Sequence, residues 1–232
     1  MDFAIIAKMR TGSSLLCSML DSHSEIQCKL EVLHRKHYNG PAQNVEEYLT
    51  RLSEARTKPV FGFKIMYHQM WGFNTPGYRT IAEALTRNKV KIIHLIRPNY
   101  LDTFLSQLLA SRSDVWNAFE SRRIDKHFIM KQPDTIEKYN SAVQIDIGKF
   151  DEYCQRYSRW SDLIDRTFQS FRVTYERIQW SSEVLDFLGV PRQDLVGDTV
   201  KLRTQSKADL ISNYQELASH LRYTKREWML LG

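Results

Sequence analysis

Two hydrophobic patterns alternate along the chain. Short, nearly continuous apolar runs, typical of buried strands, are separated by stretches in which apolar residues recur every three or four positions, as on one face of a helix. The predicted strands are Phe3–Ala7, Val60–Met66, Lys91–Ile96 and Phe171–Tyr175. This alternation predicts an α/β protein with three layers and a central, mainly parallel sheet.

Helical periodicity fills the segments between these runs. The predicted helices cover residues 15–20, 80–87, 98–109, 147–168, 180–188 and 210–221. Pro98 suits the first turn of its helix, where the N–H group that proline lacks would have no partner. Gly189, with Pro191 just beyond, is a typical helix stop. The longest helix has an apolar stripe that predicts a buried face. The stripe consists of Phe150, Tyr153, Cys154, Tyr157 and Ile164.

Nothing in the sequence marks a domain boundary. There is no internal repeat and no linker rich in Pro, Gly or Ser, so a single domain over residues 1–232 is predicted. The segment 111–144 is polar, basic and aperiodic, which predicts a loop-rich insertion with room for one short helix.

The composition is that of an ordinary globular protein. Of the 232 residues, 42% are hydrophobic and 26% are charged, which excludes disordered, collagen-like and low-complexity classes. No apolar run approaches the roughly 20 residues that a membrane span requires. The N-terminal run Phe3–Ala7 ends at Lys8 and is too short for a signal peptide. The three cysteines show no metal-ligand spacing, so reduced thiols in a cytoplasmic protein are expected.

The charge balance indicates an anionic partner. The formal net charge is +6, from 33 Lys and Arg against 27 Asp and Glu. The basic residues are dispersed, and the chain has no basic tail or arm. A dispersed charge fits a small phosphorylated ligand as well as it fits nucleic acid.

A candidate anion site lies between the first strand and the first helix, in the turn Lys8-Met-Arg-Thr-Gly-Ser-Ser14. Such a turn presents backbone N–H groups to one point, and the helix dipole adds to their attraction for an anion. The Walker A pattern requires a lysine directly after the last glycine, but Ser13 follows Gly12 here. The alternative is a simple helix cap made by Ser13 or Thr11.

A second candidate site begins at the end of the third predicted strand. Arg97 follows that strand directly, and Ser106 comes nine residues later. Ligands of open α/β sheets bind at the carboxyl ends of strands, so Arg97 is expected on the same edge as the first turn. An arginine and a hydroxyl aimed at one point can bind a second anion. A solvated helix face is the alternative.

Together these features resemble the PAPS-dependent sulfotransferases, most closely the bacterial trehalose and nodulation-factor types. Arg10-Thr-Gly-Ser-Ser14 is similar to the 5′-phosphosulfate loop of that family, although its first residue there is often lysine. Ile96-Arg-Pro-Asn-Tyr-Leu101, continued through Ser106, is similar to the 3′-phosphate motif. Residues 26–33, 173–177 and 202–228 agree as well, whereas 111–144 resemble nothing in the family.

The resemblance implies a P-loop-like α/β/α fold and an enzyme. Its donor would be 3′-phosphoadenosine-5′-phosphosulfate (PAPS), released as PAP, and its acceptor a hydroxyl of a small molecule such as a sugar or glycolipid. Neither nucleic acid nor stable membrane insertion is expected. The 5′-phosphosulfate would be held by Arg10, Thr11, Gly12, Ser13 and Ser14, and the 3′-phosphate by Arg97, Ser106 and Arg203. No metal is expected, because a sulfuryl group carries less charge than a γ-phosphoryl group.

A hydroxyl acceptor also requires a general base. The resemblance to the trehalose-type enzymes points to Glu31. His34, one helical turn further on, and His68, four residues after Lys64, remain alternatives. Lys64, near the end of the second predicted strand, could contact the sulfate or the acceptor.

One interpretation of the insertion 111–144 is that it covers the acceptor, because binding residues often lie on such segments. Its candidate residues are Trp116, Phe119, Arg122 and Arg123. Two other functions stay open. A nucleotide kinase or NTPase with a degenerate phosphate loop would depend on magnesium, and the missing Walker lysine weighs against it. A nucleic-acid binder would lose affinity steeply with salt.

Overall fold

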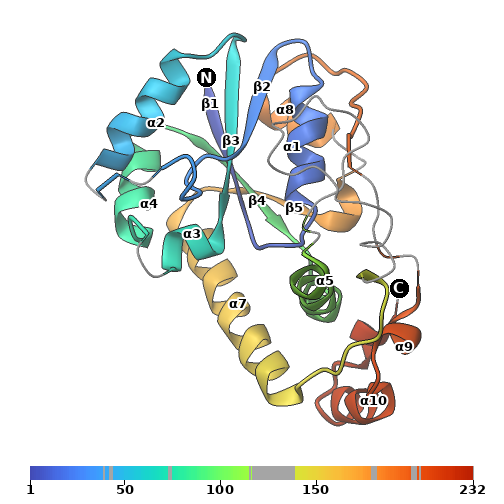
Figure 1. The fold of residues 1–232 in the computed structure, drawn as a ribbon. Coiled ribbons are helices and arrows are strands. Elements are labelled where there is room, and N and C mark those ends of the chain that lie inside the picture. The colour runs from blue at the N-terminus through green and yellow to red at the C-terminus, as the bar shows by residue number, and fades with distance from the viewer. Residues whose placement is uncertain are drawn as a thin grey trace. The chain divides into compact units, whose positions relative to one another are not determined.

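The computed structural model describes residues 1–38, 40–41, 44–72, 75–114, 116, 139–178, 182–199, 203 and 205–231. The chain divides into two compact units, which are described separately (Figure 1). The sheet unit consists of Met1–Ile96 and Trp160–Gly197, and the helical unit of Arg97–Arg159 and Asp198–Gly232. A single domain over 1–232 stays a prediction.

The sheet unit is built on a parallel sheet. Its described strands are β1 (Asp2–Ala7), β2 (Ile26–Glu31), β3 (Val60–Met66), β4 (Lys91–Ile96) and β5 (Phe171–Thr174). They lie in the order β2-β3-β1-β4-β5, and every neighbouring pair is parallel. The predicted mainly parallel sheet is therefore confirmed.

Helices cover both faces of this sheet, which gives the predicted three-layer α/β/α arrangement (Figure 1). One face carries α1 (Ser13–Asp21) and α8 (Ser182–Leu188), whose apolar side chains share one buried cluster with β1. The other helices of this unit are α2 (Val45–Glu54), α3 (Tyr67–Trp71), α4 (Tyr78–Arg87) and the 3₁₀ turn Tyr175–Arg177. Gly189 has a positive φ of 73° and ends α8, as predicted.

The helical unit packs around a second apolar cluster. Its elements are α5 (Tyr100–Ser113), the first part of α7 (Ile147–Thr167), α9 (Lys207–Leu210), α10 (Tyr214–Tyr223) and a 3₁₀ turn at Glu227–Leu230. Leu101, Leu105 and Leu109 of α5 are fully buried in this cluster. The described part of the chain contains no helix long and apolar enough to cross a bilayer.

The sequence-based element assignment missed α2 and α3 and is wrong at two further places. The helical reading of the stretch around Glu31 fails, because Ile26–Glu31 is strand β2 with alternating buried and more exposed positions at its start. The last predicted helix, 210–221, is in fact α9 and α10 separated by residues 211–213. Ser206 and Asp209 form a capping box that starts α9, and Ile211 leaves the helix to form a bridge with Val143.

Candidate functional site

The turn between β1 and α1 has a constrained backbone. Gly12 has a φ of 83°, and a Cβ atom at this position would lie 2.5 Å from the ring of Tyr175. Arg10 also has a positive φ, of 66°, which is uncommon for a residue with a side chain. Gly12 is the N-cap of α1, and no side chain caps the first turn. The alternative of a Ser13 or Thr11 cap is therefore wrong.

The hydroxyl groups of this turn have different roles. The Thr11 hydroxyl donates to the Lys8 carbonyl at 2.8 Å, and the Ser13 hydroxyl lies 3.8 Å from the Met66 sulfur. Both residues are buried and brace the turn. The Ser14 hydroxyl instead accepts a hydrogen bond from the Lys64 ammonium at 3.1 Å. Ser14 is thus the predicted hydroxyl that lies beside a cation.

Lys64 joins this turn to Glu31. Its Nζ atom lies 3.2 Å from Oε1 of Glu31, and the two side chains are only 3% and 14% exposed. Parallel pairing of β2 with β3 sets these residues opposite each other, after an irregularity between Lys29 and Glu31. The ammonium group of Lys64 therefore contacts both Glu31, the other predicted catalytic residue, and Ser14 of the predicted phosphosulfate loop.

Gln69, on α3, is a residue that sequence reasoning missed. Its side-chain N–H donates to Oε2 of Glu31 at 3.0 Å, and its oxygen accepts from the Met66 backbone N–H at 2.9 Å. Since only the amide oxygen can accept from that N–H, the orientation of the amide is fixed. No sequence signal pointed to this contact, because the N-cap of α3 is Met66 and not one of the residues typical of a capping box. We call Ser14, Glu31, Lys64, His68 and Gln69 the sheet cluster.

The alternative bases lie near Glu31. Burial lowers the pKa of His68 below its ordinary value; Glu31 opposes this shift, while His34 and Lys64 add to it. His68 is therefore neutral at pH 7, and its buried Nδ1 atom has no hydrogen-bond partner within the described residues. His34 lies in a turn, where its backbone N–H donates to the backbone carbonyl of Glu31 at 3.0 Å. The three candidate bases therefore lie close enough for the charges of Glu31 and His34 to affect the pKa of His68.

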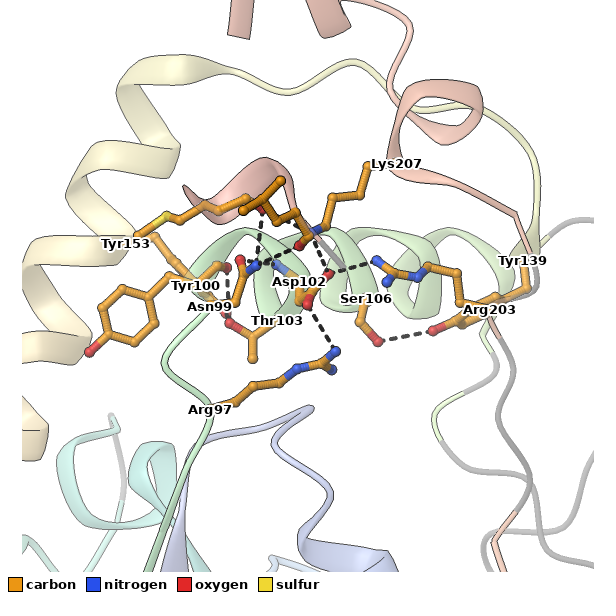
Figure 2. Close-up of polar contacts among 12 residues, drawn as sticks. Arg97, Asn99, Tyr100, Asp102, Thr103, Ser106, Tyr139, Tyr153, Arg203 and Lys207 are labelled. Carbon is orange, nitrogen blue, oxygen red and sulfur yellow. Dashed lines mark hydrogen bonds and ion pairs between the residues drawn. The ribbon is translucent and has the colours of Figure 1, made fainter. Parts of the chain in front are cut away.

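A second group of charges lies in the helical unit (Figure 2). We call Arg97, Asp102, Arg203 and Lys207 the cation cluster. Arg97 donates to Oδ2 of Asp102 at 3.0 Å, and Arg203 donates to Oδ1 at 2.8 Å. The Lys207 ammonium lies 3.3 Å from the same Oδ1. Three cations therefore surround one carboxylate, and two of them are arginines predicted to bind a phosphate.

Ser106, the third predicted phosphate ligand, is engaged elsewhere. Its hydroxyl lies 3.0 Å from the hydroxyl of Tyr139, and either group can donate (Figure 2). Ser106 follows Asp102 by four residues on α5, so the two side chains share one face of that helix. The predicted serine thus lies one helical turn after Asp102, and its hydroxyl contacts a tyrosine.

Two members of the cation cluster, Asp102 and Lys207, were not predicted. Lys207 donates to the Met229 carbonyl at 2.8 Å, and Asn99 donates to the same carbonyl at 3.0 Å. Burial lowers the pKa of Lys207, and the Asp102 carboxylate opposes that shift. These contacts attach the C-terminal segment to the start of α5. No periodicity in the sequence connects residues so far apart in the chain.

Most of the predicted acceptor cover lies outside the described residues. Phe119, Arg122 and Arg123 lie outside the described residues. Trp116 is partly buried and packs against the apolar cluster of the helical unit. The first residues of the 111–144 segment belong to α5, which extends to Ser113. A role of this segment in acceptor binding stays a prediction.

Comparison with known proteins gives a distant relationship. No protein-family model matches this chain. The chain is 24% identical to nodulation protein H of Rhizobium meliloti over 230 residues, which cover 94% of this chain and 90% of that protein. The nodulation protein H of Rhizobium meliloti strain 1021 is 25% identical over 232 residues with the same coverage. Together with the motifs around Arg10 and Arg97, this likeness supports the sulfotransferase family, and with it an enzyme, but nothing closer.

Proposed function

We propose that this protein is a sulfotransferase that uses PAPS as donor and a hydroxyl group of a small molecule, such as a sugar or glycolipid, as acceptor. The observation that carries the proposal is the position of the Lys64 ammonium, within 3.2 Å of both Ser14 Oγ and Glu31 Oε1. The ammonium group connects a loop that can bind an anion with a carboxylate that can accept a proton. The distant likeness to nodulation protein H supports the same reaction class.

In the proposed reaction the acceptor oxygen attacks sulfur while the bond from sulfur to the bridging oxygen breaks. The bridging oxygen leaves with the electron pair as part of PAP, and the acceptor proton passes to Glu31. Arg10 and the backbone N–H groups of Gly12 to Ser14 would stabilise the charge that develops on the leaving oxygen. Lys64 would contact the sulfuryl oxygens, so that catalysis rests on positioning and charge stabilisation.

The cation cluster would bind the 3′-phosphate of the donor. A phosphate monoester carries a charge of about −1.5 to −2 at pH 7, which matches the excess of positive charge around Asp102. Arg97 and Arg203 would supply paired N–H donors, and Ser106 a hydroxyl. We assign no metal to the reaction, and activity is expected to survive EDTA.

Thermal unfolding with PAP, ADP and Mg·ATP tests the proposal. A ligand at about 100 times its Kd adds roughly 2.7 kcal/mol. For a chain of this size that corresponds to a rise in Tm of about 5–10 °C. A rise with PAP and a smaller one with ADP is expected, because only PAP carries the 3′-phosphate. No rise with PAP, or a larger one with Mg·ATP, would contradict the proposal and favour the kinase alternative.

A further inference from the structure

We propose that Asp102 is a positioning residue that gives the donor site its preference for a 3′-phosphate, by holding Arg97 and Arg203 as a pair. The inference rests on the proposed function. Asp102 itself would not touch the donor.

The geometry of the carboxylate carries the first step. Each of its oxygens accepts from a different guanidinium, Oδ2 from Arg97 and Oδ1 from Arg203 (Figure 2). The two arginine side chains are 16% and 17% exposed, so they are largely removed from water. Without the carboxylate, two like charges in this setting would repel each other and turn toward solvent. The bridging carboxylate therefore keeps two arginines, distant in sequence, pointing to one place.

Asp102 is itself held in place, which a positioning role requires. Its backbone N–H donates to Oδ1 of Asn99, the N-cap of α5, at 3.2 Å. Lys207 contacts the carboxylate from a third direction and is fixed by its bond to the Met229 carbonyl. The side chain of Asp102 therefore has little freedom to leave the arginines.

The charge balance explains why the pair would select a 3′-phosphate. Three cations and one carboxylate leave two positive charges, and a phosphate monoester dianion compensates both. A nucleotide without a 3′-phosphate, such as ADP, leaves them uncompensated. Asp102 could instead act only as a competitor for the arginines, in which case its removal would tighten PAP binding. Removal of the Asp102 carboxylate should weaken PAP binding if Asp102 positions the arginines, and should tighten it if Asp102 only competes for them.

The experiment is calorimetric titration of PAP and ADP into the full-length protein and its Asp102→Asn variant. We expect PAP affinity to fall by about tenfold, the effect of losing one hydrogen bond to a charged group, while ADP affinity stays unchanged. The matched control is Asp151→Asn, because Asp151 also contacts two basic side chains in the helical unit, Arg226 and His220. This control should change neither affinity.

Several outcomes would overturn the inference. Unchanged or tighter PAP binding in Asp102→Asn would do so, as would an equal loss for PAP and ADP. If that variant does not fold, Asp102→Glu replaces it, since it keeps the charge and moves the carboxylate by one methylene group; unchanged PAP affinity there would also contradict a positioning role. Wild-type protein that binds PAP no better than ADP would refute the proposed donor as well. Wild-type preference for PAP that persists in the variants would refute the role of Asp102 alone.

Discussion

The sheet cluster and the cation cluster use the same chemical groups in different proportions. In the sheet cluster one ammonium, Lys64, pairs with one carboxylate, Glu31, and the neutral amide of Gln69 takes the second oxygen. In the cation cluster Arg97, Arg203 and Lys207 share the single carboxylate of Asp102. A balanced pair suits a place where a proton is exchanged, whereas excess positive charge suits a ligand that is permanently anionic.

The two clusters also differ in how the chain assembles them. The register of β2 and β3 places Glu31 beside Lys64, so the sheet itself fixes the central pair of the sheet cluster. The cation cluster combines residues near the start of α5 with residues just before and within α9. Its geometry therefore depends on side-chain contacts around Asp102. The two clusters are expected to respond differently to mutation, salt and pH.

The largest expected effect comes from breaking the balanced pair with Lys64→Met. Glu31 would be left as a nearly buried carboxylate without its cation, which costs about 3 kcal/mol of unfolding free energy. Turnover, measured as release of PAP from PAPS with a panel of sugar acceptors, should fall by at least about 10²-fold. Urea unfolding measures the stability change.

Lys149→Met is the matched control for that variant. Lys149 pairs with Asp146, but its side chain is 76% exposed, so the loss should not exceed about 0.5 kcal/mol. Adding Glu31→Gln to Lys64→Met should restore part of the stability, because it removes the unpaired charge. A Lys64→Met protein as stable as Lys149→Met would show that the pair is not effectively buried.

The next effect separates catalysis from donor binding. Glu31→Gln keeps the shape of the side chain but removes the base, so turnover should fall by about 10²–10⁴-fold with unchanged PAP affinity. PAP release and calorimetry measure the two quantities. His68→Gln is the comparison variant, since His68 is neutral and nearby. Parental turnover in Glu31→Gln would exclude Glu31 as the base and favour His68 or His34.

A smaller effect is expected in the cation cluster. Arg97→Ala should weaken PAP binding by about 10-fold to 100-fold, as for loss of hydrogen bonds between charged groups, and should leave ADP binding unchanged. The PAP affinity of the wild type should also fall with added salt more than its ADP affinity. Arg226→Ala, which removes one of the two basic partners of Asp151, is the control. Equal weakening of both nucleotides would place Arg97 outside the 3′-phosphate site.

Sequence patterns predicted four of the five described strands and missed β2. Continuous apolar runs gave the bounds of β3 and β4 correctly, and these bounds located Lys64 and Arg97 at strand ends. β2 is an edge strand that mixes apolar residues with Gln, Lys and Glu, so its pattern was read as helical. Its pairing with β3, which joins Glu31 to Lys64, depends on contacts distant in sequence.

The cation cluster shows the same limit more strongly. Arg97 was found from its place after a predicted strand and Arg203 by resemblance, but their shared partner Asp102 was not found. A carboxylate in the first turn of a helix is usually explained by its interaction with the helix dipole. That explanation gives no reason to expect a contact between Asp102 and residues distant in the sequence. The contact between Asp102 and Lys207 joins two helix starts that no local periodicity relates.

The smallest effect that distinguishes the clusters is their response to acid. Burial lowers the pKa of His68, so the unfolded chain binds a proton more readily than the folded chain. The stability from neutral His68 is therefore complete above about pH 6.5 and is lost as the pH falls through the lowered value. Burial lowers the pKa of His94 too, so His68→Gln should remove only part of the drop in urea midpoint between about pH 7.5 and pH 5.5. The cation cluster contains no histidine, the side chain whose ordinary pKa lies between pH 5 and pH 8, so the drop is not expected to depend on that cluster. His37→Gln, at an exposed position, is the control, and an equal change in both variants would remove the assignment to the sheet cluster.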